Sequence, residues 1–190
     1  RRFPGFCCKK GVSTGRMKIL FVSAWFPFPF DNGARIRVYN LIKALSREHQ
    51  VSLISLMQED SRPENAECLK DICEVVSLHE SRWFRPGTVK SMLGFFSSRP
   101  RSAVDTFDTA VQSAVRDTIE RISPDAVVMS TLGVAEYLPD GLTVPAILDQ
   151  HNCEHAVLRR NAEMMSSALK RLRYSLAWRK FARWESRVCR

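Results

Sequence analysis

Two short polar segments of this sequence carry the residue types that can hold an anionic ligand. The first is residues 31–33, which read Asp-Asn-Gly and are followed by Arg35 and Arg37; the second is residues 149–155, which read Asp-Gln-His-Asn-Cys-Glu-His. A glycine turn that leads into a helix offers backbone N–H groups and the positive end of the helix dipole to an anion. An arginine can add a bidentate contact to phosphate. The first segment therefore predicts phosphate binding, unless the glycine serves only the turn and the arginines are merely solvated.

The second segment contains two histidines, His151 and His155, on either side of Asn152, Cys153 and Glu154. A metal site and a Cys-His nucleophile are both open interpretations. However, zinc needs a third or fourth protein ligand, and no distant cluster of Cys or His supplies one. A cysteine nucleophile needs an activating base and an oxyanion site, which the sequence does not reveal. We therefore expect no metal and assign His151, at a strand end, a hydrogen bond to a ligand; a bond to local backbone is the alternative.

The first polar segment lies inside a predicted strand–helix–strand unit over residues 18–56. Residues 19–23 form an apolar run without polar alternation, which is typical of a strand covered on both faces in a parallel sheet. Pro27 and Pro29 then stop regular structure before the turn. Residues 51–56 are apolar again and predict a second buried strand. Two such strands joined by a helix form a βαβ unit, and ligands bind at the carboxyl ends of its strands.

The helix of this unit has an amphipathic pattern. Its apolar residues recur at helical spacing, whereas Arg35, Lys43 and Arg47 are expected on the opposite, solvated side. We expect the apolar side to pack on the sheet. The residues that define it are Ile36, Tyr39, Ile42 and Leu45.

The rest of the chain continues to alternate helices with buried strands, which predicts a three-layer α/β fold of the Rossmann type with a parallel sheet. Residues 79–101 are less regular, because Pro86, Gly87 and Pro100 interrupt a run of aromatic and aliphatic residues. We expect a helix over residues 88–96 with these side chains in the core; contact with lipid or a partner is the alternative. The other expected elements are a helix over 65–73, a strand over 74–78, a helix over 106–122, a strand over 125–129, a short helix ending at Tyr137 and a strand over 144–148.

Residues 155–190 read as a strongly basic amphipathic helix. Such a helix can lie on anionic lipid headgroups, with Trp178 and Trp184 at the interface. The simpler interpretation is a helix packed on the sheet with a solvated basic side. The residues assigned to a membrane or partner surface are Arg171, Arg173, Arg179, Lys180, Arg183 and Trp184.

The composition limits the classes of protein that need to be considered. The 190 residues are 45% hydrophobic, which is enough for one domain with a proper core. The net charge of +9 favours an anionic membrane, a phosphorylated substrate or nucleic acid. No apolar run is long enough to predict a membrane span. Nucleic acid is the least favoured partner, because no helix-turn-helix, zinc spacing or aromatic RNA-binding motif accompanies the charge.

The six cysteines show neither paired CxxC spacing nor a dense disulfide framework. This favours free thiols in a reducing cytosol, and hence a cytoplasmic protein. Cys68 and Cys73 stand beside Leu69 and Ile72 in a predicted helix, where cysteine behaves as a small hydrophobe. We expect both thiols in the core.

Residues 1–16 are basic and contain three glycines and a proline, but they lack the apolar region of a secretory signal. We expect them to be a disordered, non-native leader. Met17 stands directly before the first strand and is the expected native start.

The residues around the first polar segment resemble the amino-terminal half of glycosyltransferase family 4, whose members have the GT-B fold. Members of this family begin with a strand, a proline-rich loop, a Gly-Gly turn, a helix of the type His-Val-x-x-Leu and a Val-rich strand. The resemblance runs from about Met17 to the end of the chain. Asn32 and Gly33 stand in place of the glycine pair, Arg37 in place of the His, and residues 38–45 in place of the helix.

The second polar segment resembles the family's strand-end His-Asp, with His151 and Asn152 in those places. The resemblance implies that His151 is the catalytic residue that approaches the donor sugar. It implies that Gly33 lies near the donor diphosphate and the acceptor, and that Arg37 helps to hold the acceptor or a phosphate. Asn32 replaces a glycine and Asn152 replaces an aspartate, and these departures indicate a different acceptor.

The resemblance implies a retaining glycosyltransferase of the hexosyl type, which moves a sugar from a nucleotide-sugar donor to a cell-envelope or polysaccharide acceptor in a bacterial cell. The donor is a substrate, and no cofactor is implied. The family's donor domain, with paired glutamates and basic nucleotide-binding residues, would come after Arg190. We therefore expect residues 17–190 to be the acceptor-side domain, truncated in or after the basic helix, inactive alone, and peripheral at the inner membrane face.

A second interpretation comes from a different class of protein. The chain can be a non-catalytic Rossmann-like module that docks on an anionic membrane or a partner protein through its basic helix. An in-frame donor domain in the downstream coding sequence would favour the enzyme, and its absence would favour the module.

Overall fold

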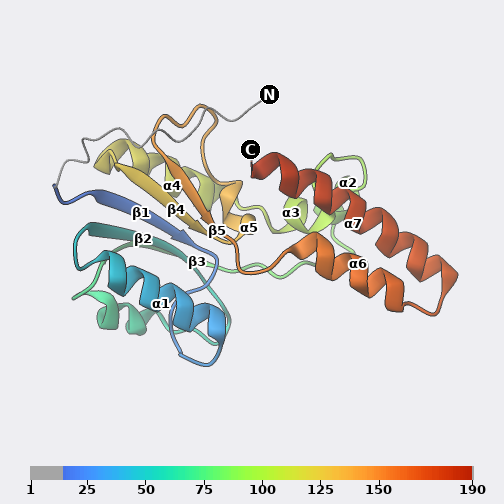
Figure 1. The fold of residues 1–190 in the computed structure, drawn as a ribbon, viewed down its shortest axis with the longest axis horizontal. Helices are drawn as coiled ribbons and strands as arrows, with labels where there is room; N and C mark the ends of the chain where they lie inside the picture. Colours follow the sequence, from blue (N-terminus) through green and yellow to red (C-terminus); the bar gives the residue numbers. More distant parts are fainter. Residues whose placement is uncertain (1–14, 190) are drawn as a thin grey trace.

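The computed structural model describes residues 15–189, in which five parallel strands form one sheet with helices on both faces (Figure 1). The strands pair in the order β3-β2-β1-β4-β5. This architecture is α/β and Rossmann-like, as the sequence predicts. The strands are β1 (Lys18–Ser23), β2 (Gln50–Met57), β3 (Glu74–Glu80), β4 (Ala126–Ser130) and β5 (Ala146–Asp149). The predicted leader lies outside the described residues except for Gly15 and Arg16.

The central strand β1 shows why the sheet needs two helical layers. Ile19 and Phe21 belong to one apolar cluster, whereas Leu20 and Val22 belong to the other, and all four are almost fully buried. Successive side chains of a strand point to opposite faces, so an uninterrupted apolar strand has two faces to cover. Helix α1 (Gly33–Leu45) and the 3₁₀ helix η1 (Pro63–Leu69) cover one face, and α4 (Thr109–Ile122) covers the other (Figure 1).

The buried side of α1 differs from the predicted one. Arg35, Val38 and Ile42 are buried, whereas 43% of Ile36 is exposed. The prediction that Arg35 lies on the solvated side is therefore wrong. A charged side chain is almost never fully buried unless it is paired, and the partners of Arg35 come from outside the helix, as described below.

The two cysteines expected in the core have different surroundings. Cys73 is buried in the cluster beneath α1, and this burial raises the pKa of its thiol to about 12. The Cys73 thiol is therefore neutral and unreactive at physiological pH. Cys68 is exposed, so the prediction for this residue is wrong. Residues 63–69 form a 3₁₀ helix, and it is Leu69 that faces the core.

The segment between β3 and α4 is only partly helical, with α2 (Val89–Leu93) and α3 (Arg101–Thr106). Its apolar side chains were expected in the core, but Leu93, Phe95 and Phe96 are largely exposed, Phe96 by 93%. Polar contacts hold the segment instead. The Arg101 guanidinium donates to the carbonyl oxygens of Ser91 and Pro86, at 2.9 and 2.7 Å. The expectation of a buried helix over residues 88–96 is therefore wrong.

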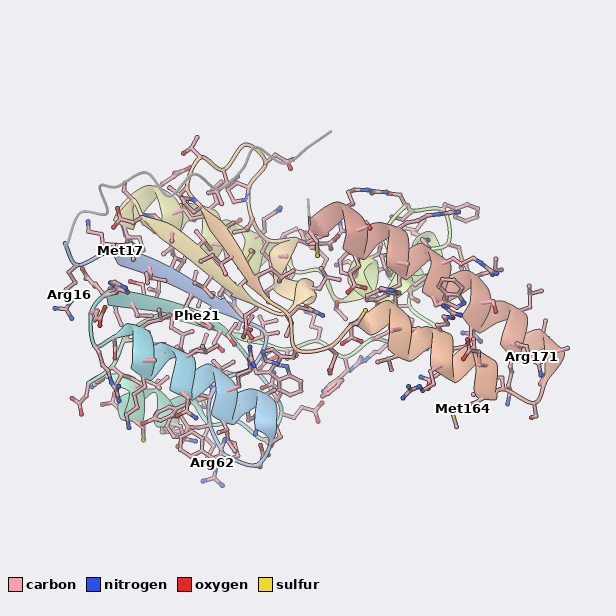
Figure 2. All side chains as sticks on the ribbon, in the orientation of Figure 1. Arg16, Met17, Phe21, Arg62, Met164 and Arg171 are labelled. Carbon is pink, nitrogen blue, oxygen red and sulfur yellow. The ribbon has the colours of Figure 1, made fainter. Side chains whose placement is uncertain are left out.

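The predicted basic helix is a hairpin of two helices, α6 (Glu154–Met164) and α7 (Ala168–Val188), which extends beyond the carboxyl edge of the sheet (Figure 1). Met164 and Arg171 lie at its tip (Figure 2). Near its other end, Trp184 is 3% exposed, and its Nε1 donates to Glu136 Oε1 at 2.6 Å. Trp184 therefore anchors the hairpin to Glu136, which directly follows the short helix α5 (Leu132–Ala135). Its assignment to the surface is wrong.

Within residues 15–189, no helix combines the length and the apolar character that a membrane span requires.

Candidate functional site

The strand order places a ligand-binding edge between β1 and β4. The chain builds the sheet outward from β1 to β3 and then continues on the other side of β1 with β4 and β5. At such a reversal the loops after two adjacent strands diverge and leave a crevice at the carboxyl ends of the strands. Residues 24–32, which follow β1, and residues 149–155, at and after the end of β5, both belong to this edge.

An ion pair joins the two polar segments across this edge. Arg37 Nε and Nη2 donate to Asp149 Oδ2 and Oδ1, at 3.0 and 2.5 Å. The two polar segments therefore lie at one edge of the sheet, although Arg37 and Asp149 are 112 positions apart in sequence. The Arg37 guanidinium lowers the pKa of Asp149, so this carboxylate is negative at neutral pH. The Arg37 side chain is 54% exposed and stays accessible to a ligand.

The same carboxylate holds His151. The imidazole Nε2 lies 3.3 Å from Asp149 Oδ2 and 3.5 Å from Ser130 Oγ, and the side chain is 13% exposed. In the neutral tautomer with the proton on Nε2, the imidazole donates to Asp149 and Nδ1 is an acceptor. Asp149 therefore orients both an arginine and a histidine, a role that the sequence does not assign to it.

The loop after β4 supports this arrangement from the neighbouring strand. Thr131 has a φ of 81°, which is strained for a β-branched residue, and its N–H donates to the Asp149 carbonyl at 3.0 Å. The Leu132 N–H donates to Gln150 Oε1 at 2.7 Å. Gln150 and Thr131 thus fix the backbone that carries Asp149 and His151. The sequence analysis included Gln150 in the second polar segment without giving it a role, and it did not single out Thr131.

The other residues assigned to ligand binding lie at or near this edge, but they do not all meet. Asn32 is the N-cap of α1, where its Oδ1 accepts from the Arg35 N–H at 3.1 Å. Gly33 begins the helix, and a Cβ at this position would meet nothing within 4 Å. Its backbone is therefore open to a ligand. Asn152 is exposed, and its carbonyl accepts from Gln150 Nε2.

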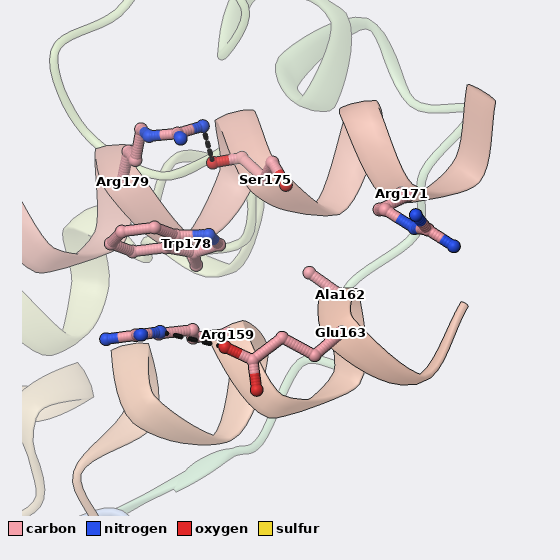
Figure 3. A pocket seen from close by; sticks show the side chains of 7 residues that line it. All are labelled: Arg159, Ala162, Glu163, Arg171, Ser175, Trp178 and Arg179. Atoms are coloured by element: carbon pink, nitrogen blue, oxygen red, sulfur yellow. Dashed lines mark hydrogen bonds and ion pairs between the residues drawn. The ribbon is translucent and has the colours of Figure 1, made fainter. Parts of the chain in front are cut away.

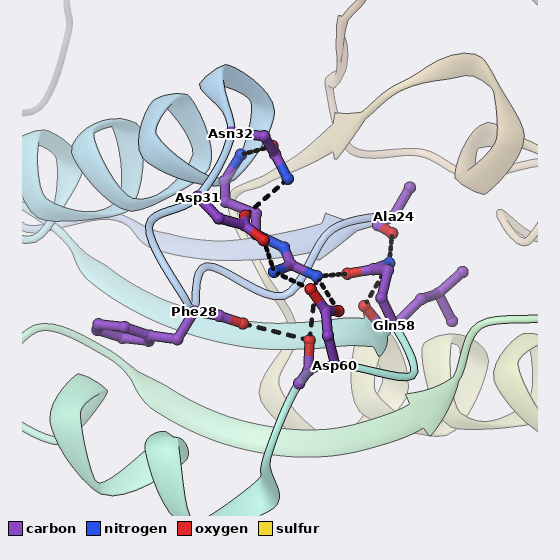
Figure 4. A network of polar contacts seen from close by, with 9 residues as sticks. Ala24, Phe28, Asp31, Asn32, Gln58 and Asp60 are labelled. Atoms are coloured by element: carbon purple, nitrogen blue, oxygen red, sulfur yellow. Dashed lines mark hydrogen bonds and ion pairs between the residues drawn. The ribbon is translucent and has the colours of Figure 1, made fainter.

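In contrast to Arg37, Arg35 is buried and forms ion pairs within the protein. Its guanidinium donates to Asp31 Oδ2 at 3.0 Å and to both carboxylate oxygens of Asp60 at 2.5 and 2.8 Å (Figure 4). Gln58 extends the network, because its Nε2 donates to the Ala24 carbonyl at 2.8 Å. The loops after β1 and β2 are therefore held together, and Arg35 is not the arginine that contacts a ligand.

A groove of about 390 Å³ lies away from the sheet edge, between α6 and α7 (Figure 3). The Trp178 ring lies between two guanidinium groups, those of Arg159 and Arg179, at 5.8 and 5.0 Å from its centroid. Of the residues assigned to a membrane surface, Arg171, Arg173, Arg179 and Arg183 are exposed. Lys180 is half-buried, and its Nζ donates to the Gly94 carbonyl at 2.6 Å.

Comparisons with known proteins add similarities of fold alone. No family model and no curated protein matches the chain. One similar solved structure is the C-terminal domain of a hydrogenase from Pyrococcus furiosus, with 18% identity, a TM-score of 0.42, and 72% of this chain and 91% of that chain covered. Another is the glycotransferase of kitacinnamycin, with 16% identity, a TM-score of 0.45 and 92% of this chain covered.

The chain spans 41% of the length of that glycotransferase. Similarities of this size carry no conclusion about function.

Proposed function

We propose that the chain is the acceptor-side domain of a retaining glycosyltransferase, in which the carboxyl edge of the sheet binds an acceptor and the diphosphate of a nucleotide-sugar donor. The observation that carries the proposal is the contact of Arg37 with Asp149, which also holds His151. This contact brings together the two segments that resemble glycosyltransferase family 4. It does so at the edge where open α/β sheets bind their ligands.

Arg37 can serve a diphosphate without leaving Asp149. A guanidinium has five N–H groups in a planar fork, and Asp149 engages only Nε and Nη2. Nη1 and the exposed side of the group remain for phosphate oxygens. The N-terminus of α1, with the open backbone of Gly33, adds N–H donors and the positive end of the dipole. Together these groups stabilise the negative charge that develops on a departing diphosphate.

His151 has the complementary role on the sugar side. With its Nε2–H donated to Asp149, the free Nδ1 can accept a hydrogen bond from a hydroxyl of the donor sugar or the acceptor. On this proposal the sheet edge supplies acceptor and diphosphate contacts, whereas the groups that hold the nucleotide base come from another part of the enzyme. Transfer by the described residues alone is not expected.

Replacing Arg37 by alanine is expected to weaken diphosphate binding about tenfold or more, because a charge-assisted pair of hydrogen bonds is lost. The probe is inorganic pyrophosphate, measured by isothermal titration calorimetry. The matched control is Arg47→Ala, which removes the same charge two residues beyond the end of α1 and should leave the affinity unchanged. Equal weakening by both substitutions would show attraction to net charge alone and would overturn the proposed site.

The sugar contact distinguishes a glycosyltransferase from a general phosphate-binding domain. Saturation-transfer NMR with nucleotide sugars should show contact to sugar protons, and His151→Ala should reduce it while His79→Ala, on β3, should not. If pyrophosphate binds through Arg37 but His151→Ala does not reduce the contact to the sugar protons of any nucleotide sugar, the glycosyltransferase proposal is wrong. The phosphate site then still stands.

A second candidate function is docking on an anionic membrane, and exposed leucines on α7 favour it. Leu169, Leu172 and Leu176 are each more than half exposed and lie on one side of the helix. The contact of Lys180 with the Gly94 carbonyl sets the exposed aromatic turn of residues 95–96 beside this helix. We propose that the leucines enter the headgroup region of the bilayer while the arginines of α7 contact anionic lipid.

Vesicle sedimentation tests this docking. Replacing Arg173 and Arg183 together by alanine should weaken binding to vesicles of phosphatidylcholine with phosphatidylglycerol about tenfold or more, since each basic residue near an anionic surface contributes about 1 kcal/mol. The charge-matched control is the double replacement of Arg116 and Arg121, exposed on α4. Binding that is equal to vesicles of phosphatidylcholine alone, or equal losses in both variants, would contradict docking through α7.

A further inference from the structure

Three potential metal ligands meet where α6 begins and α7 ends. Cys153 directly precedes α6, His155 lies in its first turn, and Glu185 lies in the last turn of α7. One ligand atom from each residue lies within 4.8 Å of the others. The sequence places Cys153 and His155 together but does not predict the third ligand, because Glu185 is 30 residues further along the chain. The antiparallel packing of the two helices brings it in.

One distance within this cluster matches a tetrahedral metal site, and a second is shorter than such a site requires. Cys153 Sγ lies 3.4 Å from His155 Nδ1, and Nδ1 lies 2.7 Å from Glu185 Oε2. In a tetrahedral zinc site, bond lengths of about 2.3 Å to sulfur and about 2.0 Å to nitrogen or oxygen separate neighbouring ligand atoms by roughly 3.3–3.5 Å. The sulfur–nitrogen distance already fits. The nitrogen–oxygen distance needs to open by about 0.6 Å, as the hydrogen bond gives way to two metal bonds.

A Cys-His-Glu nucleophile fits the same cluster less well. A histidine that activates a thiol uses the ring nitrogen opposite the one that its carboxylate holds. Here Sγ is closer to Nδ1, at 3.4 Å, than to Nε2, at 3.8 Å, and Nδ1 is the nitrogen held by Glu185. Thiol and carboxylate therefore converge on one nitrogen, as ligands around a shared cation do.

We propose that Cys153, His155 and Glu185 bind a zinc ion with thiolate, imidazole and carboxylate ligands. This mixed donor set suits the borderline-soft Zn²⁺, and three protein ligands leave one tetrahedral position for water or a small ligand. The ion links the end of α7 to the loop that begins with Asp149, and Cys153 is two residues from His151. Zinc therefore orders the backbone that carries the candidate catalytic histidine. The inference does not depend on the proposed transferase function.

The first test is metal binding by the whole chain after chelator treatment. In competition with a chromophoric chelator, the wild-type chain should take up zinc, and Cys153→Ser should weaken it by about tenfold or more, since loss of even an outer partner of a metal ligand costs that much. Glu185→Gln should also weaken it, although the amide can keep the hydrogen bond to His155. The control is Cys68→Ser, which removes an exposed thiol of η1 and should leave the affinity unchanged.

Cobalt substitution identifies the sulfur ligand. The wild-type chain with Co²⁺ should show a thiolate-to-cobalt charge-transfer band, and Cys153→Ser should abolish it. A double Cys7→Ser, Cys8→Ser variant should retain it, which separates this site from the two cysteines outside the described residues. An unchanged band in Cys153→Ser, or no zinc uptake by the wild-type chain, overturns the proposal.

Alkylation of the wild-type chain keeps the test valid if the variants fail to fold. Saturating zinc should protect Cys153 from iodoacetamide, as measured by peptide mass spectrometry, and should leave the rate at Cys68 unchanged. The same rate at Cys153 with and without zinc means that the thiol does not bind the metal, and the proposal is then wrong.

Discussion

Replacing Arg35 by alanine is expected to lower the free energy of unfolding by about 3 kcal/mol, the range seen when a large buried side chain and its hydrogen bonds are removed. The Arg35 side chain is 1% exposed, and its guanidinium bonds Asp31 and Asp60. Without it, the two carboxylates repel each other and the loops after β1 and β2 lose their link. Urea denaturation followed by circular dichroism measures the change.

Two further variants separate the role of the Arg35 side chain from the loss of a positive charge. Arg35→Lys keeps the charge but not the planar fork, so we expect an intermediate loss of stability. Arg47→Ala removes an exposed arginine of the same segment and should change stability by no more than about 0.5 kcal/mol. If Arg35→Ala and Arg47→Ala are equally stable, Arg35 has no structural role and becomes available as a second ligand-binding arginine.

Replacing Trp184 by alanine is expected to cost about 3–5 kcal/mol, the range for truncating a buried tryptophan, and to release the hairpin from the sheet. Trp184 packs against the Phe181 ring at a centroid distance of 5.0 Å and donates to Glu136. The same Glu136 carboxylate bonds Arg99, so three segments meet at this side chain. Thermal denaturation measures the loss of stability, and faster hydrogen exchange confined to α6 and α7 would show local release.

A second tryptophan of α7 provides the control. Trp178 is half-buried between Arg159 and Arg179, so Trp178→Ala should cost clearly less than Trp184→Ala. Trp184→Phe keeps the ring but loses the hydrogen bond, and should cost about 1–2 kcal/mol. If Trp178→Ala lowers the stability more than Trp184→Ala, the hairpin is anchored in the groove between α6 and α7 and not by the contact of Trp184 with Glu136.

The two central strands could be predicted from the sequence because each is a mostly apolar segment. The expected strands over residues 19–23 and 51–56 correspond to β1 and β2, each extended by one or two residues. A fully buried strand needs apolar residues on both faces, and this requirement is visible within five or six consecutive residues. The helices at the sheet faces were predicted from the helical spacing of their apolar residues. The boundaries after residue 79 were less accurate, because the 88–96 and 106–122 segments contain shorter or separate helices.

The candidate site was partly predictable for a related reason. Polar residues directly after apolar strands lie at the carboxyl edge of a parallel sheet, which correctly grouped Arg37 with residues 149–155. The residue types alone did not separate Arg35 from Arg37, since both are arginines in the first turns of one helix; only the family resemblance pointed to Arg37. The position of Asp60, 25 residues from Arg35, decided that Arg35 is buried.

By itself, the sequence determined the parallel α/β sheet, the edge at which its polar loops gather and the basic character of the carboxyl-terminal helices. These properties follow from periodicity and charge within single segments, where neighbouring residues share a face by covalent geometry. The tertiary structure decided which side chains meet across segments: Arg37 with Asp149, Trp184 with Glu136, and Glu185 with His155. Such pairs form only when packing brings together residues that are 30 to 112 positions apart, and no local pattern encodes that distance.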